Sequence, residues 1–148
     1  MITRPATLKD FSALYRIGKK TKELQVSHTE PFMTKKQLQW SITNKEGVFL
    51  VAEDAGKIVG FIYADVEDKD MPFRERYACI IYLVIIPTFR GQGVGTQLYQ
   101  ACEQRLKKLG MTHVYAWANI EAGDSVIHFN KKQGFAEGHK YMWMDKKL

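Results

Sequence analysis

The stretch Leu83-Val-Ile-Ile-Pro-Thr-Phe-Arg-Gly-Gln-Gly-Val-Gly-Thr96 joins an apolar segment to a glycine-rich loop and then to a helical pattern. The apolar run from Ala78 to Ile86 is rich in β-branched residues, which favours a buried strand, and Pro87 predicts its end. Beyond the loop, apolar residues recur at helical spacing from Val94 to Leu109, and Gly110 predicts where this helix ends. The stretch therefore predicts a strand, a loop and a helix in succession, as in a layered α/β domain.

The loop in this unit has the features of an anion-binding site. Gly91, Gly93 and Gly95 stand at alternate positions, where glycine allows tight turns and leaves backbone N–H groups open to a ligand. The helix that follows adds a partial positive charge at its N-terminus. Arg90 and the Thr96 hydroxyl can donate further hydrogen bonds. A glycine-rich turn that only packs a strand on a helix is the alternative, but three glycines beside an arginine favour an anion site.

The spacing of the loop excludes two common nucleotide sites. A P-loop ends in Gly-Lys-Ser/Thr, whereas Gly95-Thr96-Gln97 has no lysine. A dinucleotide fingerprint reads Gly-x-Gly-x-x-Gly after the first strand, whereas this loop reads Gly-x-Gly-x-Gly in the middle of the chain.

The rest of the chain predicts a mixture of strands and helices. Capping-box patterns at Thr7–Asp10 and Thr34–Gln37 predict the starts of two helices, and Asp124 is a candidate N-cap for a short helix that ends at Gly134. Gly56 predicts a tight hairpin between two apolar runs. The expected strands besides the one before Pro87 are 2–4, 48–52, 58–63, 114–118 and 141–144.

Length, composition and charge exclude some classes of protein. The length of 148 residues predicts one domain over residues 1–148. The longest apolar run has nine residues, and a membrane-spanning helix needs about 20, so we expect no membrane association. The N-terminus lacks the apolar core of a signal peptide, and both cysteines lie in apolar segments, so we expect free thiols in a cytoplasmic protein. The net charge of +6 comes from lysines spread along the chain, which favours a solubilising role over nucleic-acid binding.

Two segments resemble a known family. Arg90-Gly-Gln-Gly-Val-Gly95, preceded by an apolar strand that ends before Pro87, resembles the acetyl-CoA pyrophosphate loop, Arg/Gln-x-x-Gly-x-Gly/Ala, of the GNAT superfamily of N-acetyltransferases. Phe129-Asn-Lys-Lys-Gln-Gly-Phe135 is similar to the segment of that family that ends in Gly-Phe. The order of expected elements agrees over the whole chain. The resemblance implies an α/β (α+β) fold: a three-layer domain whose central, mixed, mostly antiparallel sheet has six to seven strands, with helices on both faces.

The same resemblance implies acetyl-CoA as co-substrate and assigns residues to it. The main chain of Leu83, Val84 and Ile85 would pair with the pantetheine arm, as an added strand pairs with a sheet edge. Asn119 is a further candidate for this contact, or else an ordinary strand-end asparagine. The residues expected around the pyrophosphate are Arg90, Gly91, Gln92, Gly93, Val94, Gly95 and Thr96.

The candidate catalytic residues are where the chain departs from the family pattern. Many relatives carry a tyrosine near the leaving thiolate, and Asn130 occupies that position here. An amide can donate a hydrogen bond to a thiolate but is not an ordinary general acid. The glutamate that relatives often place on the strand before the loop is also missing, which leaves Tyr82 on that strand and Glu121 after the next one as candidates. His28 and Glu30 are weaker ones.

These observations predict an N-acetyltransferase that moves the acetyl group of acetyl-CoA to a primary amine of a small molecule, peptide or protein by direct attack. A site without a strong base suits an amine of low pKa, because neutralising a lysine amine at pH 7 costs about 4.6 kcal/mol and an α-amine only about 1 kcal/mol. The alternative function is a non-catalytic acyl-CoA-binding sensor of the same fold. No histidine has a partner at zinc spacing, so no metal is expected. Members of the family are often dimers, so a homodimer is a possible assembly of this chain.

Overall fold

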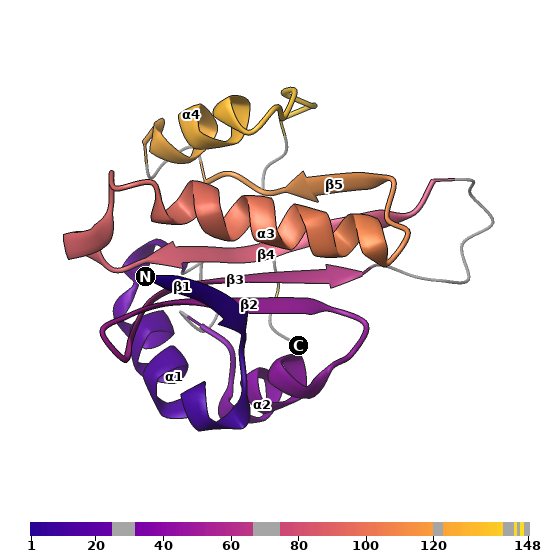
Figure 1. Ribbon diagram of the computed structural model, residues 1–148. Helices are drawn as coiled ribbons and strands as arrows, with labels where there is room; N and C mark the ends of the chain where they lie inside the picture. Colours follow the sequence, from indigo (N-terminus) through magenta and orange to yellow (C-terminus); the bar gives the residue numbers. More distant parts are fainter. Residues whose placement is uncertain (25–31, 67–74, 120–122, 141–143, 145, 147–148) are drawn as a thin grey trace.

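The computed structural model describes all residues except 25–31, 67–74, 120–122, 141–143, 145 and 147–148. Its strands and helices follow in the order expected from the sequence up to the last helix (Figure 1). In chain order they are β1 (Ile2–Pro5), η1 (Leu8–Asp10), α1 (Phe11–Lys20), η2 (Lys22–Leu24), α2 (Lys35–Thr43), β2 (Val48–Asp54), β3 (Lys57–Val66), β4 (Tyr77–Ile85), η3 (Pro87–Phe89), α3 (Val94–Lys108), β5 (His113–Ala116) and α4 (Ser125–Lys132).

The strands of the described residues form one mixed sheet in the order β1-β2-β3-β4-β5. The first four strands pair antiparallel, and β5 pairs parallel to β4. A parallel neighbour needs a long crossover connection, and α3 provides it by crossing the face of the sheet between β4 and β5 (Figure 1). The predicted mixed, mostly antiparallel sheet is therefore confirmed.

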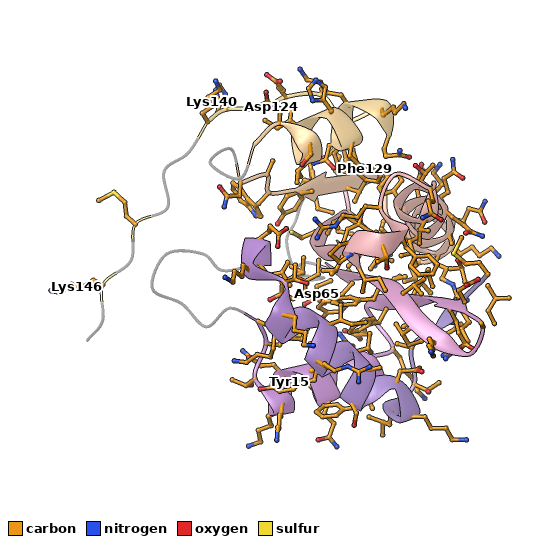
Figure 2. All side chains as sticks on the ribbon, turned by 90° about the vertical axis from the view of Figure 1, so that its left-hand side faces the viewer. Tyr15, Asp65, Asp124, Phe129, Lys140 and Lys146 are labelled. Carbon is orange, nitrogen blue, oxygen red and sulfur yellow. The ribbon has the colours of Figure 1, made fainter. Side chains whose placement is uncertain are left out.

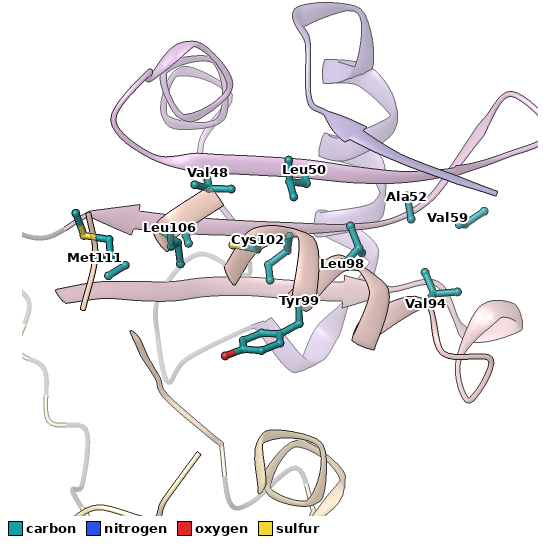
Figure 3. Packing of buried hydrophobic residues seen from close by; sticks show 13 residues of the cluster. Val48, Leu50, Ala52, Val59, Val94, Leu98, Tyr99, Cys102, Leu106 and Met111 are labelled. Carbon is teal, nitrogen blue, oxygen red and sulfur yellow. The ribbon is translucent and has the colours of Figure 1, made fainter. Parts of the chain in front are cut away.

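Hydrophobic cores on both faces of the sheet explain why β2 is apolar at successive positions. Val48, Leu50 and Ala52 pack on one face with the buried side of α3 (Figure 3). Phe49 and Val51 point to the other face, because successive side chains of a strand alternate. Each face thus buries its own set of side chains, and the predicted three layers of helix, sheet and helix are confirmed.

The second core lies under α1 and α2. Leu14 of α1 and Leu38 of α2 are fully buried there, in contact with a layer that includes Phe61 of β3. Figure 2 labels Tyr15 on α1 and Phe129 on α4, which lie far apart on two sides of the molecule. Within the described residues, no helix has both the length and the apolar character needed to cross a bilayer.

Local signals in the sequence correspond to local structure. Thr34 accepts a hydrogen bond from the Gln37 N–H at 3.3 Å, and the Gln37 side chain accepts one from the Thr34 N–H at 2.9 Å, which closes the predicted capping box. At the β2–β3 hairpin, Ala55 and Gly56 have φ values of 46° and 76°. These positive values match the tight turn that Gly56 predicted.

The expected count of six to seven strands is wrong for the described residues, which form five. The chain after α4 is irregular from Phe135 to Lys140. This segment lacks the alternation of apolar residues that a half-buried strand needs, and Ala136 to Lys140 are exposed. Most of the expected closing strand at 141–144 lies outside the described residues.

Candidate functional site

The glycine-rich loop turns the chain from η3 into the N-terminus of α3. Gly91 and Gly93 have φ values of 74° and 80°, and Gly93 is the N-cap of α3. Side chains rarely tolerate this conformation, so glycine is required at both positions. A Cβ added at either glycine would meet no atom within 4 Å. The first N–H groups of α3 have no partner within the helix, and they therefore lie beside open space, as an anion site requires.

Gly95 serves a different purpose from the other two glycines. It lies in the first turn of α3, and a Cβ there would come within 3.3 Å of the Phe129 ring. Its absence lets α4 approach α3 closely, where Phe129 also contacts Tyr99 edge-on at a ring separation of 6.5 Å. Gly95 thus fixes the position of α4 beside the N-terminus of α3.

Arg90 is already engaged by two groups of the protein. Its Nε donates to the Ile85 carbonyl at 3.0 Å, and both terminal nitrogens lie 3.3 Å from Oε1 of Glu23. A hydrogen bond from its own backbone N–H and the charge of Arg90 lower the pKa of Glu23, so this carboxylate is ionised at neutral pH. Arg90 therefore connects the end of β4 and the loop before α3 to η2.

The other loop side chains are also placed by contacts within the protein. Gln92 donates from Nε2 to the Thr88 carbonyl at 2.8 Å. The Thr96 hydroxyl accepts from Nε2 of Gln133 at 3.3 Å, and keeps its own proton to donate. Val94 is buried, so only its main chain can face a ligand.

The strands β4 and β5 part in the middle of β4. Their parallel pairing covers Tyr77 to Ile80 opposite His113 to Ala116. From Tyr82 to Ile85, β4 keeps its antiparallel partner β3 but has no paired strand on the other side within the described part of the chain. A strand edge with unpaired N–H and C=O groups is a template for an extended ligand.

Hydrogen-bond alternation shows which main-chain groups of β4 face this gap. Ile86 donates its N–H to the Val59 carbonyl of β3 at 3.0 Å. Paired residues of an antiparallel ladder alternate between bonded and non-bonded pairs, so Val84 also bonds to β3. Leu83 and Ile85 then direct their main-chain groups away from β3, and the contact of the Ile85 carbonyl with Arg90 agrees with this. Of the three residues expected to bind pantetheine, Leu83 and Ile85 are therefore better placed than Val84.

A β-bulge lies next to the point where the strands part. Tyr63 pairs with Tyr82 and Ala64 pairs with Ile80, so Ile81 is an extra residue in β4. The Ile81 side chain is 41% exposed. A bulge bends its strand and increases the local twist, which turns the second half of β4 away from β5.

Tyr82 lies on the face of β4 that packs against the α1 and α2 side of the molecule. Its ring is 5.2 Å from that of Phe32. Burial raises the pKa of Tyr82, so its phenol keeps its proton at neutral pH and cannot serve there as a base.

The other residues expected to take part in catalysis or CoA binding do not form a cluster with Tyr82 in the described structure. Asn130 lies in the last turn of α4, where its carbonyl accepts from the N–H groups of Gln133 and Phe135 at 3.0 and 3.1 Å. No hydrogen bond connects it to Tyr82 in the described structure. Asn119 is exposed, three residues after β5, and Glu121 lies outside the described residues, as do His28 and Glu30.

Neither the cysteines nor the side chains that commonly bind metals form a reactive centre in the described residues. Cys79 and Cys102 are free and buried, and burial raises the pKa of Cys102 to about 12. In the part of the chain that the structure describes, no three His, Cys, Asp or Glu side chains are grouped to hold a metal ion.

The sequence model of the Acetyltransferase (GNAT) family matches residues 11–135, from α1 through the Gly-Phe segment. The chain belongs to this GNAT family of acetyltransferases. The match includes the glycine-rich loop, the parted strands β4 and β5, and α4, so the residues described above lie inside the shared region.

Curated relatives of this GNAT protein match it over part of their length. An uncharacterized N-acetyltransferase of Methanocaldococcus jannaschii is 33% identical over 99 residues, which are 67% of this chain and 43% of that protein. An N-alpha-acetyltransferase of Sulfurisphaera tokodaii is 29% identical over 98 residues, which are 62% of this chain and 58% of that protein. The matched region thus spans less than two thirds of either relative.

Solved structures share the fold of this GNAT protein at low sequence identity. A mutant of the BH1408 protein from Bacillus halodurans superposes with a TM-score of 0.82 and 18% identity, over 99% of this chain and 100% of that one. The aminoglycoside N-acetyltransferase AAC(6')-Iy in complex with CoA gives a TM-score of 0.77 and 14% identity, over 99% and 100%. These likenesses show the GNAT fold.

Three features of the site are not predicted by the sequence. Glu23 is one polar residue in a polar segment, 67 positions from Arg90, and nothing in the pattern marks it as a partner. The bulge at Ile81 lies in a run that is apolar on both faces, so no alternation shows the extra residue. Gln133 belongs to the segment that ends in Gly-Phe, but nothing in that pattern indicates its contact with Thr96.

Proposed function

We propose that this protein transfers the acetyl group of acetyl-CoA to a primary amine by direct attack. The observation that carries the proposal is the juxtaposition of two binding surfaces that the same strand supplies. Within the described part of the chain, β4 has an unpaired edge at Leu83 and Ile85, and the strand leads through η3 into the open loop at the N-terminus of α3. An extended pantetheine arm and a pyrophosphate need these two surfaces in this order.

The residues present fit the pyrophosphate and pantetheine of CoA. Gly91 and Gly93 place no side chain over the N-terminus of α3, so the first N–H groups of the helix can reach phosphate oxygens. The Thr96 hydroxyl can donate to the same group. Leu83 and Ile85 can exchange main-chain hydrogen bonds with the amides of the pantetheine arm, as in β-strand addition. When bound, acetyl-CoA supplies an acetyl group that is activated as a thioester.

The chain's own groups can then assist transfer without forming a covalent bond. A main-chain N–H of Leu83 or Ile85 that faces the gap can donate to the thioester oxygen, where negative charge develops. The Asn130 amide can donate to the leaving sulfur. Tyr82 keeps its proton and packs against Phe32, so the candidate bases are Glu121 and, more weakly, His28 and Glu30.

Direct attack agrees with the state of the cysteines. Cys102 is fully buried on the inner side of α3, and its pKa of about 12 keeps it as an unreactive thiol at neutral pH. An acyl-enzyme on this residue would need both a thiolate and access to substrate. Two free, buried thiols also agree with a cytoplasmic location.

The acceptor is a primary amine of a small molecule, peptide or protein. The names of similar proteins point to two subclasses, an α-amine for the N-alpha-acetyltransferase of Sulfurisphaera tokodaii and an amine of an aminoglycoside for a structural neighbour. The absence of a strong base on β4 favours an amine with a low pKa, because such an amine is partly neutral at pH 7.

The decisive experiment is calorimetric binding of acetyl-CoA and desulfo-CoA to the wild type and to Gly93→Glu. We expect micromolar affinity for the wild type and a loss of about 100-fold or more in the variant, because like charges placed together in a binding site cost several kcal/mol. Absence of binding by the wild type would overturn the proposal.

Two control variants separate charge from backbone strain. Gly93→Gln puts a neutral side chain on the same left-handed backbone, and we expect a smaller loss of affinity than with glutamate. Gly56→Glu introduces a carboxylate at the β2–β3 hairpin, where φ is 76° and a Cβ meets no atom within 4 Å. This variant is expected to bind like the wild type. Equal losses in Gly93→Glu and Gly93→Gln would show that backbone strain alone weakens binding, and a loss in Gly56→Glu would show an effect that does not depend on the loop.

The alternative function, a sensor that binds acyl-CoA without turnover, is supported by Asn130 in place of the tyrosine. Release of free thiol from acetyl-CoA distinguishes the two functions when α-amino peptides, ε-amino peptides and an aminoglycoside are offered in turn. Turnover with any acceptor supports the transferase, and binding with no turnover over the panel supports the sensor.

A further inference from the structure

We infer that Glu23 competes with the CoA pyrophosphate for the guanidinium of Arg90 and thereby limits the affinity of the site. This inference rests on the proposed function and goes beyond it, because it concerns a residue of η2 that lies outside the glycine-rich loop. Glu23 would act through Arg90, as a positioning residue.

The geometry shows that Arg90 has no free side of its guanidinium for a bidentate contact. A guanidinium can present two nitrogens together either from Nε and one terminal nitrogen or from both terminal nitrogens. Nε is bonded to the Ile85 carbonyl at 3.0 Å. Both terminal nitrogens share the single Oε1 of Glu23. A phosphate can therefore form a two-pronged contact with Arg90 only by replacing one of these partners.

Of the two partners, Glu23 is the one that a phosphate can replace. Its contacts are 3.3 Å long, and the two side chains are 50% and 53% exposed, so water screens the pair and its contribution is small. The Ile85 bond is shorter, and it satisfies a carbonyl at the end of a strand. A phosphate at the N-terminus of α3 adds hydrogen bonds from the helix, which Glu23 does not receive.

The exchange has two consequences for binding. Glu23 lowers the affinity for CoA, because the Arg90–Glu23 pair must separate first and because an ionised carboxylate remains near the phosphate. It also gives the departing CoA product a group that recaptures Arg90, which speeds release.

The test measures CoA affinity and dissociation rate for Glu23→Gln, with Glu75→Gln as a control of equal charge change. Glu75 is exposed and lies just before β4 begins, at the end of the strand away from the loop. We expect Glu23→Gln to bind CoA about threefold to fivefold more tightly, within the range measured for exposed ion pairs, and to release it more slowly. Glu75→Gln should bind like the wild type.

A double-mutant cycle with Arg90→Ala separates exchange from simple repulsion. We expect Arg90→Ala alone to bind CoA about tenfold more weakly, as for a lost charge-assisted hydrogen bond. In that background, Glu23→Gln should gain clearly less than it gains in the presence of Arg90. An equal gain in both backgrounds would show repulsion without exchange, and would overturn the inference.

The other outcomes are equally distinct. Weaker binding by Glu23→Gln would mean that Glu23 holds Arg90 in the phosphate-binding geometry, and no change would mean that the ion pair is irrelevant. Either result overturns the inference and leaves the proposed function standing, provided that the wild type binds CoA. If the wild type binds no CoA, both fall.

Discussion

The two edges of β4 differ although they belong to the same strand. One edge is paired with β3 from Ala78 to Ile85 except at the Ile81 bulge, and in the described residues the other edge is paired with β5 for four residues. The paired edge is sealed by hydrogen bonds and by cores on both faces of the sheet. The other edge turns away from its neighbour at the Ile81 bulge. A single strand can thus stabilise the sheet along one edge and leave its other edge open to a ligand.

Proline substitutions should reveal the largest difference between the edges. Val84→Pro removes an N–H that bonds to β3, and we expect a loss of about 3 kcal/mol or more in the free energy of unfolding. Leu83→Pro removes an N–H that faces the gap, as on an edge strand. We expect it to remain folded and to bind CoA about tenfold more weakly. Urea unfolding and calorimetry measure the two effects.

Leu83→Ala and Val84→Ala report the loss of the side chain alone and serve as controls for this pair. If both proline variants lose the same stability after this correction, the assignment of the two N–H directions is wrong.

Gly60 on β3 probes how closely the paired edge is packed. A Cβ there would lie 2.6 Å from the tip of the Ile85 side chain and 2.8 Å from the Val84 carbonyl oxygen. The side chain can move but the backbone cannot, so we expect Gly60→Ala to cost about 2 kcal/mol. Gly138→Ala, where a Cβ meets no atom within 4 Å, should change stability by less than about 0.5 kcal/mol. Equal unfolding midpoints in urea would contradict this.

Hydrogen exchange should show that the two edges differ in local stability. Backbone amides of β5, which is held by four parallel pairs, should exchange at least about tenfold faster than those of β3, which has partners on both sides. Addition of CoA should slow exchange at Leu83 and Ile85. Equal exchange rates in β5 and β3 would show that the strand beside the open edge of β4 is locally as stable as the strand on its paired edge.

The smallest effect is expected at Tyr82, which faces neither edge but the core under α1 and α2. Burial raises its pKa, so the phenol stays protonated at neutral pH, and we expect it to take no part in proton transfer. We expect Tyr82→Phe to keep kcat/KM within about threefold and to leave the shape of its pH profile unchanged. A pH-dependent loss above tenfold would make Tyr82 a catalytic residue.

The sequence was sufficient to predict the layers and the order of elements up to α4. Capping boxes, glycine turns and apolar periodicity act within a few residues of one another, so they can be read directly from the chain. The loop from Arg90 to Thr96 could be predicted for the same reason, because its positive φ values and the helix N-terminus after it follow from the local spacing of glycines.

Features that depend on distant residues could not be predicted. The bulge at Ile81 requires β3 to pair with β4, and a run buried on both faces carries no signal of register. The Glu23 contact joins segments 67 positions apart. The closing strand expected from Tyr141 to Met144 lies mostly outside the described residues, and it stays a prediction.

Gly93 and Gly95 stand on either side of Val94, and a side chain is restricted at these two positions for different physical reasons. A left-handed backbone at Gly93 restricts that position to glycine, with asparagine or aspartate as the next most tolerated residues. The limit at Gly95 is the distance of 3.3 Å to a ring that can shift slightly, so a methyl group is nearly acceptable there. The GNAT signature has glycine at the first of these positions and glycine or alanine at the second. The glycine at the first position therefore reflects the positive φ at Gly93, and the glycine or alanine at the second reflects the short distance between α3 and α4.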